Sequence, residues 1–382
     1  MAAETDTVER AVDRFEWVDP TLVGFCAGSL ALTVLAGLVQ VSFGTFTMSL
    51  ATAWRAVFDP AVWTRPGVLA TLLLGDGLAA SLGLSTGYTL ARETLVVWSI
   101  RMPRVLVAAL VGLSLSLSGA IFQAVTKNEL ASPFILGVSS GAGLAILLTL
   151  VAFPALSALL PVTAAVGGTV AFLLVYAIAW KGGTSPVRLV LAGVIVGTVL
   201  NSLQTALFFF AGDVGTVQQA VAWTTGSLTG VDWEQVRMVL PWVVLVVLPG
   251  TVLGARQLNV LLLGESTASA LGMRVERTRF LLSGVGIVAA AASVAVAGIV
   301  GFVGLIVPHM VRTVVGTDHK RLLVGCAFAG PALLVVADVL ARLSFEVAFG
   351  SPTQLPVGIV TGIVGGPYFL YLMRRRQQLG EL

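Results

Sequence analysis

Charged residues are scarce in this sequence. Only 11% of its 382 residues are Asp, Glu, Lys or Arg, whereas 57% are hydrophobic and the mean hydropathy is +0.97. Because about a quarter of the residues of a water-soluble globular protein are charged, this composition excludes that class. The long uncharged runs also lack the alternating pattern of barrel strands. The sequence therefore predicts an all-α integral membrane protein.

Cysteine, histidine and lysine are almost absent as well. The two cysteines lie far apart in apolar runs, so we expect neither a disulfide nor a metal site. Residues 137–141 match the G-x-S-x-G pattern of hydrolases, whose serine needs a nearby histidine and an acidic residue. The two histidines, His309 and His319, lie beside basic residues at the predicted inner edge, which argues against a hydrolase. None of the three lysines belongs to a phosphate-binding loop. We therefore expect no enzymatic activity, and if ATP drives this protein, another chain must bind it.

The apolar runs predict ten transmembrane helices at about 20 residues per span. The predicted spans are residues 22–46, 105–125, 134–153, 162–180, 189–211, 238–253, 280–297, 299–315, 323–345 and 356–373. One transmembrane domain, residues 22–375, then lies between a cytoplasmic segment, 1–21, and a cytoplasmic tail, 376–382. An extended outer loop, 47–100, contains an apolar piece at 68–84 that carries Asp76. We interpret this piece as interfacial or re-entrant, with a true span as the alternative.

The basic residues predict that both termini are cytoplasmic. With the N-terminus inside, 15 of the 22 lysines and arginines face the cytoplasm and seven lie outside. A further span at 68–84 would place every later loop on the opposite side of the membrane and remove this asymmetry. Residues 1–20 are mainly acidic in charge, so the first apolar run is expected to be retained as a helix of a multi-pass protein of the cell (inner) membrane. The net charge of +3 gives no reason to expect nucleic acid as a partner.

Glycine and proline interrupt the most informative stretch, residues 294–321. Gly298, Gly301, Gly304 and Pro308 make it a poor continuous helix. Such breaks persist within a bilayer only where the freed backbone groups face protein or a water-filled path. The stretch therefore indicates a protein that moves something across the membrane.

Two further features suggest partner proteins. The longest inner loop, 255–279, contains a short, capped, amphipathic helix, for which a simple connector and a docking element are equally favoured. On the outer side, Arg101 and Arg104 share one face of a helix start, and Arg342 follows Asp338 by one turn. Snorkelling anchors with an Asp338–Arg342 pair are the first interpretation. An outward cationic rim for acidic residues of an extracellular partner is the alternative.

Six motifs in order resemble the permease subunit of ATP-binding-cassette (ABC) importers for iron chelates and cobalamin, the FecCD or BtuC-like family. They are RMPRVLVAALVGLSLSLSGAIFQAVTKNELASPFILGVSSGAG at 101–143, RLVLAG at 188–193, LLLGESTASALGM at 261–273, AGIVGFVGLIVPHMVRTVVGTDHKRLL at 297–323, ADVLARL at 337–343 and LPVGIVTGIVGGPYF at 355–369. The resemblance covers nearly the whole chain. It implies the type II ABC importer permease fold and a homodimer with the path along its two-fold axis. Two ATP-binding subunits would lie below and a substrate-binding protein outside, with ATP and Mg bound by the ATPase subunits and no cofactor bound by this chain.

The resemblance also implies roles for individual residues. The inner loop would dock the ATPase through Gly264, Glu265, Ser266, Ala268, Leu271 and Gly272. Arg101, Arg104 and Arg342 would receive acidic residues of the binding protein. The inner gate and path would include Thr184, Ser185, Pro186, Val187 and Asn201. His309 would cap an inner helix break, and no residue is expected to be catalytic or to hold a metal.

The chain departs from the family pattern at three places. Glu129 replaces the proline of an Asn-Pro-Leu-Ala motif, Gln354 stands where glutamate is frequent, and the segment around Asp76 is longer than usual. The predicted function is import of a metal chelate by alternating access, with cobalamin favoured over a ferric siderophore or haem from overall likeness alone. A secondary transporter or channel is the alternative from another class. It would need intramembrane carboxylates, and Asp338 is the only deep candidate.

Overall fold

The computed structural model describes residues 17–43, 48–84, 90–181, 183–350 and 353–378, and these are almost entirely helical. Seven helical stretches within these ranges are long and apolar enough to cross a bilayer. They are Pro20–Ser42, Arg92–Val125, Pro154–Ala179, Pro186–Phe208, Trp233–Leu262, Val275–Ala297 and His319–Phe345, and three shorter apolar helices are Val138–Ala152, Val303–Val315 and Val357–Tyr371. The all-α membrane class is thus confirmed. The count of ten spanning helices stays a prediction, because three of the ten are short.

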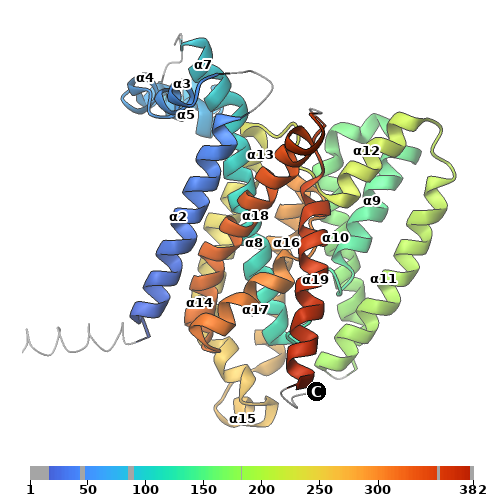
Figure 1. Ribbon diagram of the computed structural model, residues 1–382. Helices are drawn as coiled ribbons and strands as arrows, with labels where there is room; N and C mark the ends of the chain where they lie inside the picture. Colours follow the sequence, from blue (N-terminus) through green and yellow to red (C-terminus); the bar gives the residue numbers. More distant parts are fainter. Residues whose placement is uncertain (1–16, 44–47, 85–89, 182, 351–352, 379–382) are drawn as a thin grey trace, which may run out of the picture.

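The helices follow one another along the chain with few long connections (Figure 1). In order they are α2 (Pro20–Ser42), α3 (Leu50–Val57), α4 (Pro60–Trp63), α5 (Pro66–Leu74), α6 (Asp76–Ser81), α7 (Arg92–Val96), the π-helical turn η1 (Val97–Arg101), α8 (Met102–Val125), α9 (Val138–Ala152), the 3-10 helix η2 (Pro154–Leu159), α10 (Leu160–Ala179), α11 (Pro186–Phe208), α12 (Val214–Thr225), α13 (Trp233–Trp242), the π-helical turn η3 (Val243–Val247), α14 (Leu248–Leu262), α15 (Glu265–Ala270), α16 (Val275–Ala297), α17 (Val303–Val315), α18 (His319–Phe349) and α19 (Val357–Gln378).

Helix α8 forms the centre of the protein and packs against α16, α17 and α18. Glycines allow the close approach: a Cβ atom at Gly112 would lie 2.3 Å from the Gly330 carbonyl oxygen of α18. Serine hydroxyls of α8 add hydrogen bonds to neighbouring helices, from Ser116 to the Cys326 carbonyl at 2.9 Å and from Ser118 to the Gly286 carbonyl at 2.7 Å. Small residues and hydroxyl hydrogen bonds therefore let these helices pack closely around α8.

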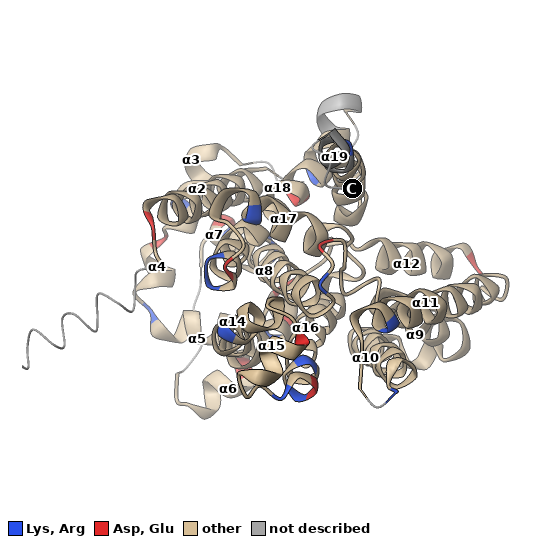
Figure 2. Cartoon of the chain, turned by 90° about the horizontal axis from the view of Figure 1, so that it is seen from below, with Lys and Arg blue, Asp and Glu red and all other residues tan. Residues whose placement is uncertain are grey.

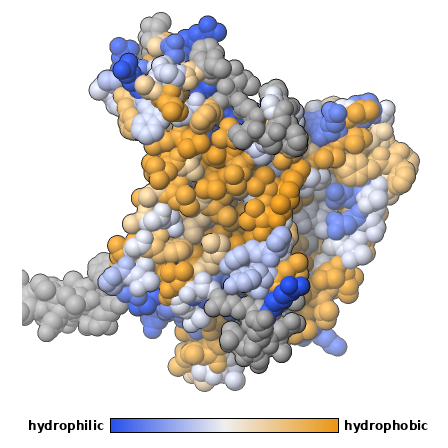
Figure 3. Space-filling model, viewed as in Figure 1, coloured by the Kyte–Doolittle hydropathy of each residue, from blue (hydrophilic) through white to orange (hydrophobic). Residues whose placement is uncertain are grey.

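Helices α9, α10, α11 and α12 form a second group beside this core (Figures 1 and 2). The two groups join where α10 packs against α16. Helix α19 lies against α17 and α18, on the side of the core that faces the second group (Figure 2). Between the two ends of the molecule, the surface in Figure 3 is a broad apolar band, as a bilayer-spanning protein requires.

The outer loop forms a cluster of short helices, α3 to α7, at one end of α2 (Figure 1). Hydrogen bonds attach it to the core, including one from the Arg237 guanidinium of α13 to the Leu72 carbonyl at 3.0 Å. The apolar piece at 68–84 is divided between α5 and α6 by Gly75, whose φ is +85°. At 1.5 Å per residue, the 9 residues of α5 extend only about 14 Å, too short to cross a bilayer.

Several predicted boundaries were wrong. The sixth span continues as helix to Leu262, because Ala255, Leu258 and Leu261 recur at helical spacing and are buried, so this part of the predicted inner loop is helical. The eighth span begins at Val303, not at 299, because Gly298 and Phe302 have φ of +68° and +66° and break the helix. Its 13 residues extend about 20 Å.

The ends of the chain and the stretch after the fifth span also differ from the prediction. The last helix continues through Gln378 into the predicted tail. Helix α12 falls where only a loop was expected. Residues 1–16 and 379–382, which belong to the predicted terminal segments, lie outside the described residues.

Candidate functional site

Helix α15 projects beyond the ends of the long helices (Figure 1). Glycines flank it, Gly264 with φ of +106° and Gly272 with φ of +82°, and a Cβ atom at either would meet nothing within 4 Å. The backbone conformation therefore requires glycine at both positions, whereas packing does not. Leu271 is 65% exposed, while Ala268 is completely buried. Of the predicted coupling residues, Ala268 attaches α15 to the protein, and Glu265, Ser266, Leu271 and Gly272 lie at its surface.

The turn between α10 and α11 contains the predicted inner gate. Ser185 caps α11 by accepting a hydrogen bond from the Arg188 backbone N–H at 3.3 Å, and Pro186 occupies the first turn, where its missing donor costs nothing. Arg188 folds back over the turn, donating to the Gly183 carbonyl at 2.8 Å and to the Ser185 hydroxyl at 3.2 Å. Thr184 is buried, and Val187 is exposed. Residues of its own segment thus hold one side of the turn.

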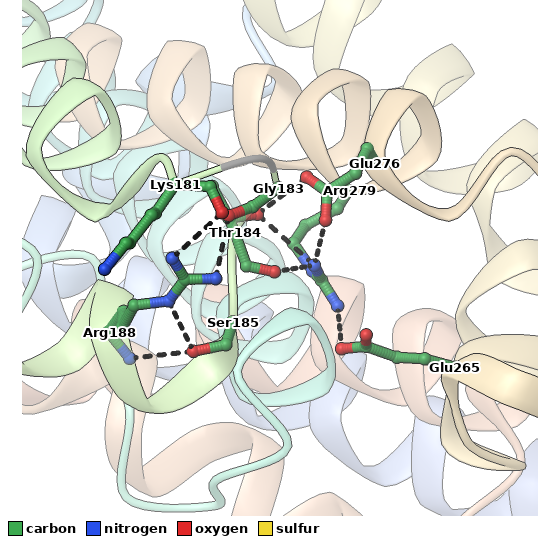
Figure 4. A network of polar contacts seen from close by, with 8 residues as sticks. All are labelled: Lys181, Gly183, Thr184, Ser185, Arg188, Glu265, Glu276 and Arg279. Carbon is green, nitrogen blue, oxygen red and sulfur yellow. Dashed lines mark hydrogen bonds and ion pairs between the residues drawn. The ribbon is translucent and has the colours of Figure 1, made fainter.

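Arg279, near the start of α16, joins the turn to α15 (Figure 4). Its Nη2 lies 2.6 Å from a Glu265 oxygen and its Nη1 lies 2.8 Å from a Glu276 oxygen. Nη1 also donates to the Thr184 carbonyl and, at 3.2 Å, to the Thr184 hydroxyl. That hydroxyl donates to the other Glu276 oxygen at 2.9 Å. Two predicted sites, the coupling helix and the inner gate, therefore meet at one guanidinium group.

This role of Arg279 was not predicted from the sequence. It lies within a run of loop arginines and contributed only to the count of inner basic residues, while Glu276 was not singled out. The i,i+3 spacing of Glu276 and Arg279 was a local signal for an ion pair. The contacts to Glu265 and Thr184 depend on the tertiary fold.

Glu129, the residue in place of the family's proline, faces α17. Its carboxylate oxygens lie 3.5 Å from Arg312 Nη1 and 3.8 Å from His309 Nδ1. Arg312 also donates to the Gln123 side chain at 3.0 Å. His309 lies inside α17 and does not cap a break, contrary to the prediction. At this position the departure from the family pattern adds an acidic partner for two basic residues.

The predicted outer arginines lie at the end of the molecule opposite α15. Arg104 donates from Nε and Nη2 to the two Asp338 oxygens at 2.8 and 2.9 Å, and from Nη1 to Gln354 at 2.7 Å. Asp338 thus pairs with Arg104, a partner that the sequence did not suggest. Arg101 is buried and donates to the Val41 carbonyl.

Arg342 lies near these residues and donates to the Gln40 carbonyl at 3.1 Å. It is partly exposed, whereas Arg101 and Arg104 are buried. All three make hydrogen bonds within their own chain, and contact with a binding protein stays a prediction.

Helix α11 presents a polar stripe to the outside of the chain. Asn201, Thr198, Ser202 and Thr205 are exposed, although the helix is apolar enough to span a membrane. The three hydroxyl groups donate to backbone carbonyls of their own helix at 2.8 to 2.9 Å. This side-chain pattern suits contact with water or another polar surface better than contact with lipid.

Comparisons with known proteins agree on the class of this chain. The model of the FecCD transport family matches residues 31–375. The iron(3+)-hydroxamate import system permease protein FhuG of Bacillus subtilis (strain 168) is 38% identical over 297 residues, which are 76% of this chain and 86% of the relative. The cobalamin import system permease protein BtuC of Halobacterium salinarum (strain ATCC 700922 / JCM 11081 / NRC-1) is 43% identical over 284 residues, 74% of each chain.

A solved structure is similar along nearly the whole fold. It is described as an inward-facing conformation of a metal-chelate type ABC transporter and superposes with a TM-score of 0.73 at 25% identity. The similarity covers 92% of this chain and 98% of the other chain. The elements around α15, Arg279 and α11 thus belong to an architecture with a close structural counterpart.

Proposed function

Because this chain belongs to the FecCD transport family, we propose that it is the membrane subunit of an ATP-driven importer in which cobalamin, delivered by a binding protein, crosses at the interface of a homodimer. Its class, a metal-chelate ABC importer permease, follows from the family and from the relatives above. The cargo, the partners and the mechanism are the proposed parts.

Helix α15 is the single observation that carries the proposal. It is short, projects from one end of the molecule, and exposes Leu271 between two glycines (Figure 1). Acidic and basic residues gather at this end, around α15 and α16 (Figure 2). A compact helix with an exposed apolar residue and surrounding charge suits docking to a water-soluble ATPase subunit. We therefore place this end, and both termini, in the cytoplasm.

The polar stripe of α11 supports a homodimer. The exposed Asn201 amide would be unfavourable against lipid, and together with Ser202 and Thr205, whose hydroxyl groups bond to their own helix, it suits a water-containing path between two copies of the chain. Helix α19 contributes exposed apolar residues, including Ile363 and Leu370, which suit the packed part of such an interface. Alternating access would follow if ATP-driven movement of the two subunits opened this path first to one side and then to the other.

The contacts of Asp338 argue against an ion-coupled secondary transporter. A carboxylate that binds a coupling ion must be available to that ion. Both oxygens of Asp338 accept hydrogen bonds from Arg104, and one also accepts from Gln40 at 2.6 Å. The side chain is therefore satisfied by its own protein.

The cargo is the least constrained part of the proposal, because the two relatives carry names for different chelates. Cobalamin is the first candidate, and ferric siderophores and haem compete with it. Uptake of labelled cobalamin and of a labelled ferric hydroxamate, measured in cells that carry this permease with its genomic neighbours, separates these cargoes. Uptake of the ferric chelate alone would overturn the cobalamin assignment.

Replacing 265–271 with a Gly/Ser linker of equal length tests the docking role of α15. We expect loss of ATPase subunits from the purified complex and loss of stimulated ATP hydrolysis. Monodisperse elution in detergent provides the control for folding. Retention of the ATPase subunits by this variant would contradict the proposal.

A further inference from the structure

We propose that Arg279 is the positioning residue that transmits movement of α15 to the turn between α10 and α11. This inference rests on the proposed function, because it takes α15 as the contact with the ATPase subunits. It adds a specific connection between that contact and the inner gate. The connection consists of the ion pairs and hydrogen bonds drawn in Figure 4.

Arg279 is buried, and its partners belong to more than one element of the structure. Its side chain is only 1% exposed, whereas that of Glu265 is 47% exposed. A buried guanidinium is costly unless its donors are paired, so its position depends strongly on where its partners lie. One partner belongs to α15, one to α16 and one to the turn. The position of the Arg279 side chain therefore depends on all three elements.

Helix α15 can move as a unit relative to the long helices. Gly264 and Gly272 flank it, and glycine adopts a wider range of backbone angles than any other residue, so both positions suit hinges. Two described contacts attach the helix to the protein between these glycines: buried Ala268 and the Glu265–Arg279 ion pair. Displacement of α15 would consequently pull on Arg279 through Glu265.

The turn responds to the same guanidinium group. Thr184 is buried, and both its carbonyl and its hydroxyl oxygen accept from Arg279. Gly183 lies against Glu276, since a Cβ atom there would be 3.3 Å from a Glu276 oxygen. A shift of Arg279 and Glu276 would thus change the surroundings of the turn directly. Movement of α15 could therefore reach the turn through Arg279 and Glu276 without movement of another element.

Arg188 provides a matched comparison on the same turn. Its hydrogen bonds go to Lys181, Gly183 and Ser185, all within the segment that it belongs to. It therefore stabilises the turn without reaching α15. Substituting Arg188 tests loss of local order, whereas substituting Arg279 tests loss of the connection.

The experiment uses the complete complex of this chain with its ATPase subunits. Cys26 and Cys326 are replaced, and Val187→Cys, at a position 68% exposed beside the turn, carries a spin label. Double electron–electron resonance spectroscopy then measures the distance between the two spin labels of the homodimer, without nucleotide and with ATP and vanadate. We expect the distance to change with nucleotide in the parent and in Arg188→Lys, but not in Arg279→Gln.

A second measurement separates coupling from folding. Cargo transported per ATP hydrolysed should fall about tenfold in Arg279→Gln, within the usual range of coupling between sites, and recover in part in Arg279→Lys. Arg279→Lys keeps the charge and also decides the question if Arg279→Gln does not fold, because one ammonium group cannot retain the geometry of all these contacts. For Arg279→Lys we expect a nucleotide-dependent change of the label distance between that of the parent and that of Arg279→Gln.

The two proposals fail differently. If the parent gives no distance between labels, or no response to nucleotide, the proposed homodimeric ABC importer is contradicted. If the parent responds and both Arg279 variants respond equally, with unchanged transport per ATP, then the role of Arg279 is wrong and the proposed function stands.

Discussion

Replacing Asp338 with Asn should destabilise this protein strongly, although the two side chains have nearly the same shape. Arg104 donates two hydrogen bonds to the Asp338 oxygens, and the two side chains are 9% and 2% exposed. Asparagine removes the negative charge and replaces one of the two acceptor oxygens with an NH2 donor, so the buried guanidinium keeps only neutral acceptors, including the Gln354 side chain. Removing one partner of such a pair costs about 3–5 kcal/mol.

The chain contains a built-in probe for measuring this loss. Cys326 is completely buried in α18, the helix that carries Asp338, so a thiol-reactive dye should label it only on unfolding. In a Cys26→Ser background, the dye signal on heating reports the unfolding of the core. We expect Asp338→Asn to lower Tm by on the order of 5–10 °C, taking about 2 °C per kcal/mol for a large chain.

Two controls separate the ion pair from other effects. Glu234→Gln changes an exposed carboxylate and should leave Tm almost unchanged. The double substitution Arg104→Met with Asp338→Leu should recover most of the loss, because apolar replacement of a buried pair is often neutral or stabilising. A Tm of Asp338→Asn equal to that of the parent would show that the protein does not need Asp338 to neutralise Arg104.

Two further predictions concern packing and pH. Gly119→Ala should reduce folded yield and lower Tm, because its Cβ would lie 1.8 Å from the Gly304 carbonyl oxygen, whereas Gly24→Ala, with nothing within 4 Å, should be tolerated. Hydrogen bonds from the Thr94 hydroxyl and the Ala61 N–H lower the pKa of Asp59. The contact between α4 and α7 is therefore stabilised above the ordinary carboxyl pKa of about 4 and weakened as pH falls through the lowered folded value. Hydrogen exchange of α4 should show this weakening in the parent and not in Asp59→Asn.

The sequence predicted the membrane class because long apolar runs leave few other solutions. The predicted helix boundaries were wrong where the local sequence pattern and the tertiary structure favour different ends for a helix. The glycines before α17 indicated a break, but the left-handed conformation of Phe302, which sets the start of the helix, is rare for a non-glycine residue. Helix α12 was missed because its polar residues do not resemble a membrane span.

The candidate site was only partly predictable for a similar reason. Motif resemblance located Glu265 and Thr184 separately. Their connection depends on Arg279, which contacts Thr184 across 95 positions of the sequence, and Arg104 reaches Asp338 across 234 positions. An arginine in a basic loop and a buried, ion-paired arginine have the same appearance in a sequence. Only the fold separates them.

The central claim, that this chain is the permease of an ATP-driven importer, is tested most directly by uptake into proteoliposomes. The vesicles contain the permease and its ATPase subunits, with ATP and Mg on the α15 side and the loaded binding protein on the other side. We expect the chelate to accumulate only when ATP and the binding protein are both present. Equal accumulation without ATP, driven by a proton or sodium gradient, would contradict it.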